Sequence, residues 1–221
     1  MIRFALPVLT VLCLTGLHAQ HNRLELPTAY IRNESLGNNQ LPQNVEGSPY
    51  YDENFRSGQI RIGDTAYAAL LRYNAFTDEI EMQEGGQVRE LFKRDYISAR
   101  IGDTEYAIRT YDDKGGQRQG YFRILTQGKA ELLLRMTKDL QEGREATTSY
   151  GKDQPPRFTE TSDYYLVSEG KAARKVRLRK KELQESFPEK WGELEAYGKQ
   201  NGLDLKTERD VIRLVQHYNA L

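Results

Sequence analysis

The sequence predicts a mainly β fold, an antiparallel β-meander of the sandwich or barrel type, with an α-helical hairpin at its C-terminus. Three observations predict it. Between residues 50 and 178, short segments of alternating polar and apolar residues are separated by glycine-containing turns. Tyrosine, which suits half-buried strands, occurs 14 times against 7 phenylalanines. From residue 179 onwards, the apolar period changes from two to about 3.6 residues.

The first twenty residues have the pattern of a secretory signal peptide. A short basic start containing Arg3 precedes an apolar run from Phe4 to Leu17, which is shorter than the roughly 20 residues that a membrane-spanning helix needs. Ala19 provides the small residue that signal peptidase requires, so we expect cleavage after Ala19 or Gln20. A retained membrane anchor is the alternative that the short run disfavours.

The cysteine content fits an exported protein without disulfides. The single cysteine, Cys13, lies inside the signal segment, and Leu12 occupies the position where a lipoprotein signal carries a small residue. We therefore expect an unlipidated chain in the periplasm or cell envelope, or secreted, with no transmembrane segment. Its mean hydropathy of -0.74 agrees with this. Without disulfides, the mature chain must be stabilised by burial of its core.

Residues 21–49 are predicted to be an extended leader, because they are rich in Asn, Gln and Pro and show little apolar periodicity. The β-meander domain is predicted at 50–178. Within it, RIGDTAYA at 61–68 recurs as RIGDTEYA at 100–107, with one difference. Gly-Asp between alternating segments predicts a tight hairpin turn, so each copy is read as strand, turn, strand. The match favours duplication of a hairpin unit over two independent solutions to one turn.

Further turn signals divide the rest of the domain into eight to ten short strands. They lie at 76–78, 85–86, 115–116, 127–129 and 169–170, and the longest interruption is 141–157. Leu132, Leu133 and Leu134 are consecutive, which indicates that this part of the sheet is covered on both faces.

Residues 179–221 are predicted to be a helical tail packed on the sheet. A helix opens over residues 180–187, and Pro188 suits the first position of the next helix. Trp191, Leu194 and Tyr197 form the apolar stripe of that helix, which ends at residues 201–202. Residues 207–210 (TERD) resemble a capping box that begins a last helix.

The charges and motifs exclude several classes of function. Lys plus Arg and Asp plus Glu are 32 each, so no global field would attract nucleic acid. The mature chain has two histidines, His21 and His217, and no cysteine, so we expect no metal site and no cofactor. No Gly-x-Ser-x-Gly motif is present, and the glycine pairs lie in hairpin turns rather than between a strand and a helix. We expect no catalytic residues.

Three groups of residues remain as candidates. Glu79 and Glu81 lie on one strand face, and Asp112 and Asp113 lie in a turn; such pairs serve carboxylate-dependent hydrolases but also arise by chance among 32 acids. Exposed tyrosines would stack on sugar rings, although packing between strands is the more common role. The candidates are Tyr50, Tyr51, Tyr73, Tyr111, Tyr164 and Tyr165.

The third group is the basic run from Lys171 to Lys181, which contains no acid. Strand alternation places Lys175, Arg177 and Arg179 on one face. The functional interpretation is a site for polyanions; the alternative, which we favour, is a sheet edge protected from aggregation by charge. The residues of the polyanion patch are Arg174, Lys175, Arg177, Arg179 and Lys180.

Several stretches together resemble a group of uncharacterised exported proteins of Bacteroidetes-type bacteria. These are 48–55 (SPYYDENF), 71–81 (LRYNAFTDEIE), and the tail from Phe187-Pro188 through Leu203 to 215–219 (VQHYN). The resemblance implies a periplasmic or envelope protein and no particular activity.

We therefore expect a non-enzymatic exported envelope protein that acts by macromolecular interaction, with an envelope protein or a polyanionic glycan or lipid as partner. The alternatives are binding of a glycan or small ligand through sheet tyrosines, and a carboxylate-dependent hydrolase.

Overall fold

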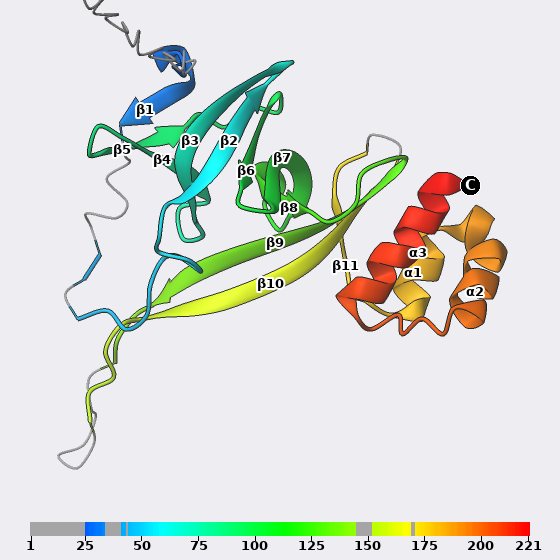
Figure 1. The fold of residues 1–221 in the computed structure, drawn as a ribbon. Helices are drawn as coiled ribbons and strands as arrows, with labels where there is room; N and C mark the ends of the chain where they lie inside the picture. The colour runs from blue at the N-terminus through cyan, green and yellow to red at the C-terminus, as the bar shows by residue number, and fades with distance from the viewer. Residues whose placement is uncertain (1–24, 34–40, 43, 145–151, 169–170) are drawn as a thin grey trace, which may run out of the picture.

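The residues that the structure describes form one eleven-stranded antiparallel sheet followed by three helices (Figure 1). The computed structural model describes residues 25–33, 41–42, 44–144, 152–168 and 171–221; the expected signal peptide at 1–20 lies outside them. The mainly β class with a helical tail is confirmed, and the sheet is not a closed barrel, since β1 and β11 stand at its two ends. The strands are β1 (Ile31–Asn33), β2 (Arg56–Ile62), β3 (Thr65–Asn74), β4 (Glu79–Glu84), β5 (Gln87–Leu91), β6 (Ile97–Ile101), β7 (Thr104–Asp113), β8 (Gly116–Ile124), β9 (Ala130–Gln141), β10 (Arg157–Ser168) and β11 (Arg174–Val176).

The two copies of the sequence repeat form the centre of the sheet. Gly63 and Gly102 begin two-residue turns with φ of 57° and 56°, and a positive φ at the first turn position is what a type II′ hairpin requires. β2 pairs with β6 so that Ile60 faces Ala99, and these two residues occupy equivalent positions just before each repeat. The strand order β5-β4-β3-β2-β6-β7-β8-β9 is therefore symmetrical about this joint, with a four-stranded meander on each side.

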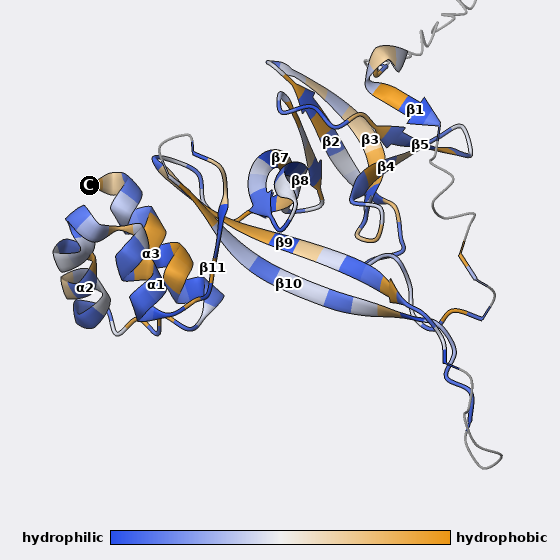
Figure 2. Ribbon diagram, turned by 180° about the vertical axis from the view of Figure 1, so that it is seen from behind, coloured by the Kyte–Doolittle hydropathy of each residue, from blue (hydrophilic) through white to orange (hydrophobic). Residues whose placement is uncertain are grey.

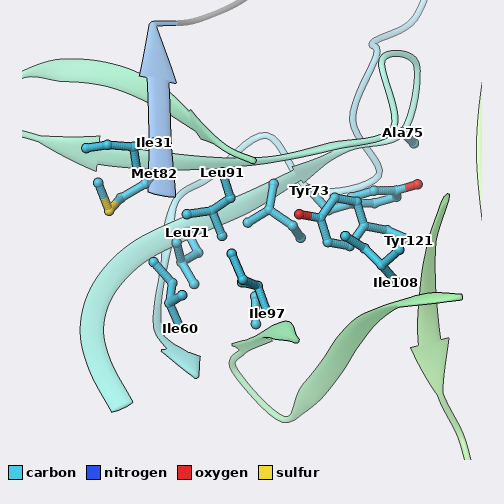
Figure 3. Close-up of a cluster of buried hydrophobic side chains, with 12 residues drawn as sticks. Ile31, Ile60, Leu71, Tyr73, Ala75, Met82, Leu91, Ile97, Ile108 and Tyr121 are labelled. Carbon is cyan, nitrogen blue, oxygen red and sulfur yellow. The ribbon is translucent and has the colours of Figure 1, made fainter. Parts of the chain in front are cut away.

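The first apolar core lies against one face of β1 to β8. Ile60, Leu71, Ile80, Leu91 and Ile97 are at most 1% exposed, and each has a polar residue next to it in its strand. Figure 3 shows Ile60, Leu71, Leu91 and Ile97 pointing toward one another, together with Tyr73 and Tyr121. The period of two that predicted the strands thus also selects the residues of this core.

The turn between β3 and β4 bridges the curled sheet. The backbone N–H of Tyr121 on β8 donates to Asp78 Oδ1 (3.2 Å), and the N–H of Lys138 on β9 donates to the carbonyl of Ala75 (3.0 Å). Gly120 permits this approach, because a Cβ at that position would lie 2.9 Å from Asp78 Oδ2. Side-chain and turn contacts thus take the place of the strand pairing that would close a barrel.

The second apolar core joins the long β9–β10 hairpin to the helical tail. The helices are α1 (Lys180–Ser186), α2 (Trp191–Gln200) and α3 (Glu208–Ala220), with a short 3-10 turn η3 (Pro188–Lys190) before α2. Leu132 and Leu166 of the hairpin pack with Leu183, Leu194 and Leu214 of the tail. Figure 2 shows apolar residues of α1 and α3 next to β11. No helix in the described ranges is long and apolar enough to cross a membrane.

Two expectations about the tail need correction. The tail is not a helical hairpin: the segment predicted at 180–187 does form a helix, but as a separate one (180–186) in addition to the two predicted after it, so the tail contains three helices. The capping box at Thr207 is not formed: Thr207 precedes α3, but its hydroxyl donates to the carbonyl of Asp204 (3.1 Å). Asp210 instead accepts from the backbone N–H of Asp204 (3.0 Å), so the acid fixes the preceding loop rather than the cap.

Part of the predicted leader at 21–49 is folded. A 3-10 turn η1 (Thr28–Tyr30) leads into β1, which pairs with β5 and buries Ile31 in the first core. Further along, Glu46 forms a bridge with Arg157 at the start of β10. Composition misled here, because three residues of strand are too few to produce a periodic signal.

Candidate functional site

The paired carboxylates Glu79 and Glu81 lie on one face of β4, as predicted, but that face is covered. Register aligns a row of four charged residues across β1, β5, β4 and β3, in the order Arg32, Glu90, Glu81, Arg72. Arg32 Nε lies 2.9 Å from Glu90 Oε2, and Arg72 Nε lies 2.6 Å from Glu81 Oε2. The two acids are fully buried, so the flanking guanidinium groups offset their mutual repulsion.

Glu79 extends this network toward solvent. Its Oε1 lies 2.8 Å from Arg32 Nη2 and 3.3 Å from Lys93 Nζ, whereas its buried Oε2 has no hydrogen-bond partner among the described residues. Burial raises the pKa of Glu79, against the opposite effect of Lys93 and Arg32. With Glu79 7% exposed and Glu81 fully buried, the pair cannot reach a substrate as acid and base.

The tyrosines do not form one open platform. Tyr73, Tyr111 and Tyr165 are at most 8% exposed. Tyr111 and Tyr165 pack edge to face with each other and with Phe122, at 5.1 to 5.8 Å between ring centroids. Tyr50 and Tyr164 donate to Glu81 and Glu208, and the partly exposed Tyr51 donates to the carbonyl of Thr137. Packing between strands is the role that the geometry gives most of them.

The basic run is only partly a strand. β11 ends at Val176, so the strand face predicted for Lys175, Arg177 and Arg179 does not exist beyond Lys175, although all three side chains are exposed. The prediction was wrong because the alternation of polar and apolar residues continues in the sequence past Val176, the last residue that pairs with β10. β11 is the last strand of the sheet, where charged residues also discourage edge-to-edge association.

The run is acid-free in sequence but not in space. Lys175 Nζ lies 2.6 Å from Asp163 Oδ2 on β10, and Lys180 Nζ lies 2.8 Å from Glu195 Oε1 on α2. Arg174 donates to Ser186 Oγ (2.7 Å), and the backbone N–H of Arg177 donates to Glu182 (2.6 Å). Thus the five patch residues do not act as one surface. Arg179 and Lys180 belong to a different feature of the tail.

That feature is a groove on the helical tail, which we call the tail groove, with a volume of about 500 Å³. Its apolar lining comes from both ends of α2 and from the loop that leads to α3. Trp191 begins α2, and Gly198 near its end leaves room beside Leu194. Gly202 turns the chain with φ of 61°, so that Leu203 and Leu205 complete the lining. The apolar members of the tail groove are Trp191, Leu194, Gly198, Gly202, Leu203 and Leu205.

Six charged residues line the tail groove, and they carry an excess of positive charge. Arg179, Lys180, Lys199 and Lys206 give four cations, against the two acids Glu195 and Asp204, a net charge of +2. Hydrogen bonds from Lys180 and then Lys199 lower the pKa of Glu195 to about 2, so this carboxylate stays ionised and occupies both lysines. Arg179 and Lys206 make no ion pair within the described part of the chain.

The sequence predicted only part of this site. Arg179 and Lys180 were candidates as basic residues, and Trp191 and Leu194 as members of a core stripe. The contribution of Leu203, Leu205 and Lys206 was missed. Glycines at 198 and 202, followed by the loop Leu203-Asp204-Leu205-Lys206 with alternating polarity, are the signal that would have indicated it.

Other candidates are accounted for by packing. His217 stacks on Tyr197 with ring centroids 3.8 Å apart, and the described residues hold no group of three or more His, Cys, Asp or Glu arranged for a metal ion. Asp112 and Asp113 were predicted to lie in a turn, but they are the last two residues of β7 and pair with Gln117 and Gly116 of β8. Asp113 Oδ2 also lies 3.2 Å from Arg118 Nη1.

Comparison of the chain with known protein families, with curated proteins and with solved structures gave no match. The similarity to exported proteins of Bacteroidetes-type bacteria therefore stays a prediction. Function must be inferred from the groove and its charges.

Proposed function

We propose that this chain is an exported, non-enzymatic protein of the periplasm or cell envelope, and that it binds an anionic envelope component at the tail groove. The observation that carries the proposal is the combination of an apolar lining with a net charge of +2. A concave apolar site with a few convergent polar groups is the usual form of a ligand site. The buried and paired state of Glu79 and Glu81 argues against the hydrolase alternative.

Arg179 and Lys206 supply the attraction that a partner would feel. Neither is neutralised by an ion pair within the described residues, and each cation near an anionic surface contributes about 1 kcal/mol. Lys180 and Lys199 share Glu195 and contribute less. Of the basic run, only Arg179 and Lys180 line the tail groove and can contribute to binding there.

Co-sedimentation of the mature chain with phosphatidylglycerol vesicles tests the proposal, with phosphatidylcholine vesicles as the neutral comparison. We expect binding to the anionic vesicles at low salt, lost at high salt because of screening. The double variant R179Q/K206Q should bind at least tenfold more weakly. The control R61Q/K114Q removes two exposed cations from the meander and should bind as the wild type does. No wild-type binding, or equal loss in both variants, would refute the proposal.

A further inference from the structure

The backbone around the tail groove indicates what kind of ligand fits. The N–H groups of Gly202 and Leu203 donate to the carbonyls of Lys199 and Gly198, at 3.3 and 2.9 Å. Those of Asp204 and Lys206 donate to carboxylate oxygens of Asp210 and Asp204, both at 3.0 Å. Four donors of the loop are therefore already satisfied inside the tail.

The backbone groups of a peptide bound in this groove would lose their hydration. Its carbonyl groups could not replace that hydration with hydrogen bonds from these four N–H groups, because all four already donate within the tail. Every peptide unit carries one donor and one acceptor, and burying them unpaired costs free energy. A hydrocarbon chain carries neither. The half-buried Leu203 and Leu205 offer it apolar contacts beside Trp191, which is 6% exposed, over a floor that contains the fully buried Leu194. The volume of about 500 Å³ lies in the range of small-ligand pockets.

We infer that the tail groove holds a single acyl chain with an anionic headgroup, whose charge is met by Arg179 and Lys206. The excess of two positive charges in the lining selects against a cationic headgroup. The inference rests on the proposed function, because it names the chemistry of the anionic component bound at the same site. Binding is non-covalent, so that the burial of the chain supplies affinity and the charges supply selectivity.

Trp191 provides a built-in reporter, since it is the only tryptophan of the chain and it lines the groove. Titration of the mature chain with monomeric laurate should change the emission of Trp191 saturably. Dodecyltrimethylammonium, whose alkyl chain is about as long and whose charge is opposite, should bind at least tenfold more weakly. Hexanoate should also bind at least tenfold more weakly, because it buries fewer methylene groups.

Two variants on the same helix separate occupation of the groove from damage to the fold. In Gly198→Met, a side chain placed in the lining should abolish the laurate response. Gly198 is buried, but a Cβ there would meet only Leu214 Cδ1, at the ordinary contact distance of 4.0 Å. Gly192→Met is the matched control, exposed and with nothing within 4 Å of its Cβ. It should respond to laurate as the wild type does, and circular dichroism should show both variants folded.

The outcomes distinguish the two proposals. Equal responses to laurate and dodecyltrimethylammonium, or an unchanged laurate response in Gly198→Met, would overturn the acyl-chain inference. If vesicle binding nevertheless persists and depends on Arg179 and Lys206, the proposed function stands without it. If laurate binds as expected but the vesicles are not bound, the groove is an acyl-chain site and the proposed function fails.

Discussion

Glu79 shows how burial of a single carboxyl group can outweigh the effect of two neighbouring cations. It is the most exposed acid of the buried network, and only one of its two oxygens is paired with Arg32 and Lys93. Its raised pKa follows from burial, which disfavours the charged form more than the two cations favour it. Since the folded chain holds this proton more tightly than the unfolded chain, Glu79 makes stability depend on pH.

We predict that the free energy of unfolding of the wild type decreases as pH rises through the titration of Glu79, and that Glu79→Gln abolishes this decrease. The decrease begins near the ordinary glutamate pKa of about 4.3 and ends above the raised pKa of the folded chain. Over that interval one proton changes the free energy of unfolding by at most about 1.4 kcal/mol per pH unit. Urea unfolding between pH 4 and 7 measures the difference between wild type and variant. The exposed control Glu142→Gln should follow the wild type, and parallel curves for Glu79→Gln would contradict the prediction.

At the scale of elements, the end of α3 is fastened to the turn between β8 and β9 by one side chain. Asn219 Oδ1 accepts from the backbone N–H of Ala130 (2.8 Å). Its Nδ2 donates to the carbonyls of Gln127 (3.0 Å) and Ala130 (2.9 Å). Gly128 lies under the amide, where a Cβ would come within 2.6 Å of Asn219 Cγ. The contact joins residues about ninety positions apart and orients the tail on the sheet.

Asn219→Ala should destabilise the chain by about 1–3 kcal/mol, because it leaves partly buried backbone groups of the turn without partners. Urea unfolding followed by Trp191 fluorescence measures the change from within the tail. Asn201→Ala is the matched control: its exposed amide makes a single local hydrogen bond to the carbonyl of Tyr197, so its effect should stay within about 0.5 kcal/mol. Equal effects of the two substitutions would show that the Asn219 contact does not hold the tail.

Features that depend on adjacent residues could be predicted from the sequence, whereas contacts between residues far apart in the chain could not. The Gly-Asp turns at 63 and 102 appear where expected, because turn geometry depends on adjacent residues. The pairing of Arg32 with Glu79 and Glu90 could not be predicted, because Arg32 precedes these residues by 47 and 58 positions. The tail groove was missed for a related reason: the glycines and the alternating polarity at residues 198–206 mark a loop with an apolar side, but they do not record that this loop packs against α2.

At the scale of the whole molecule, two cores are connected by the β9–β10 hairpin. One end of the hairpin carries Leu132 and Leu166 into the core shared with the tail, while Tyr73 of the first core donates from its hydroxyl to the carbonyl of Met136 farther along β9 (3.2 Å). Leu133 and Tyr165 face the opposite side and pack with Tyr111 and Phe122. Both faces of the hairpin are thus covered where it carries the three leucines, as their run predicted, whereas residues 160–162 of β10 are exposed.

A chain that ends at residue 178 should therefore not be stable on its own. Without the helices it would expose Leu132, Leu166 and Val176, which are at most 6% exposed in the full chain. Such an apolar patch beside the β11 edge favours association. We expect the truncated chain to bind a hydrophobic dye and to aggregate, as measured by fluorescence and sedimentation, while the full mature chain does neither. A monomeric truncated chain without dye binding would show that the meander folds independently of its tail.

The symmetrical joint between β2 and β6 has a consequence for the origin of the fold. Under the duplication hypothesis, an ancestral chain with one four-stranded unit would have an open β2 edge, and two such chains would pair there in an isologous dimer. Fusion would turn that dimer contact into an internal one, with Ile60 and Ala99 on the former axis. The two halves differ at their far turns: four residues separate Asn74 from Glu79, whereas two separate Asp113 from Gly116. The longer turn is the one that reaches β8 and β9, so the departure from symmetry is what locks the two halves together.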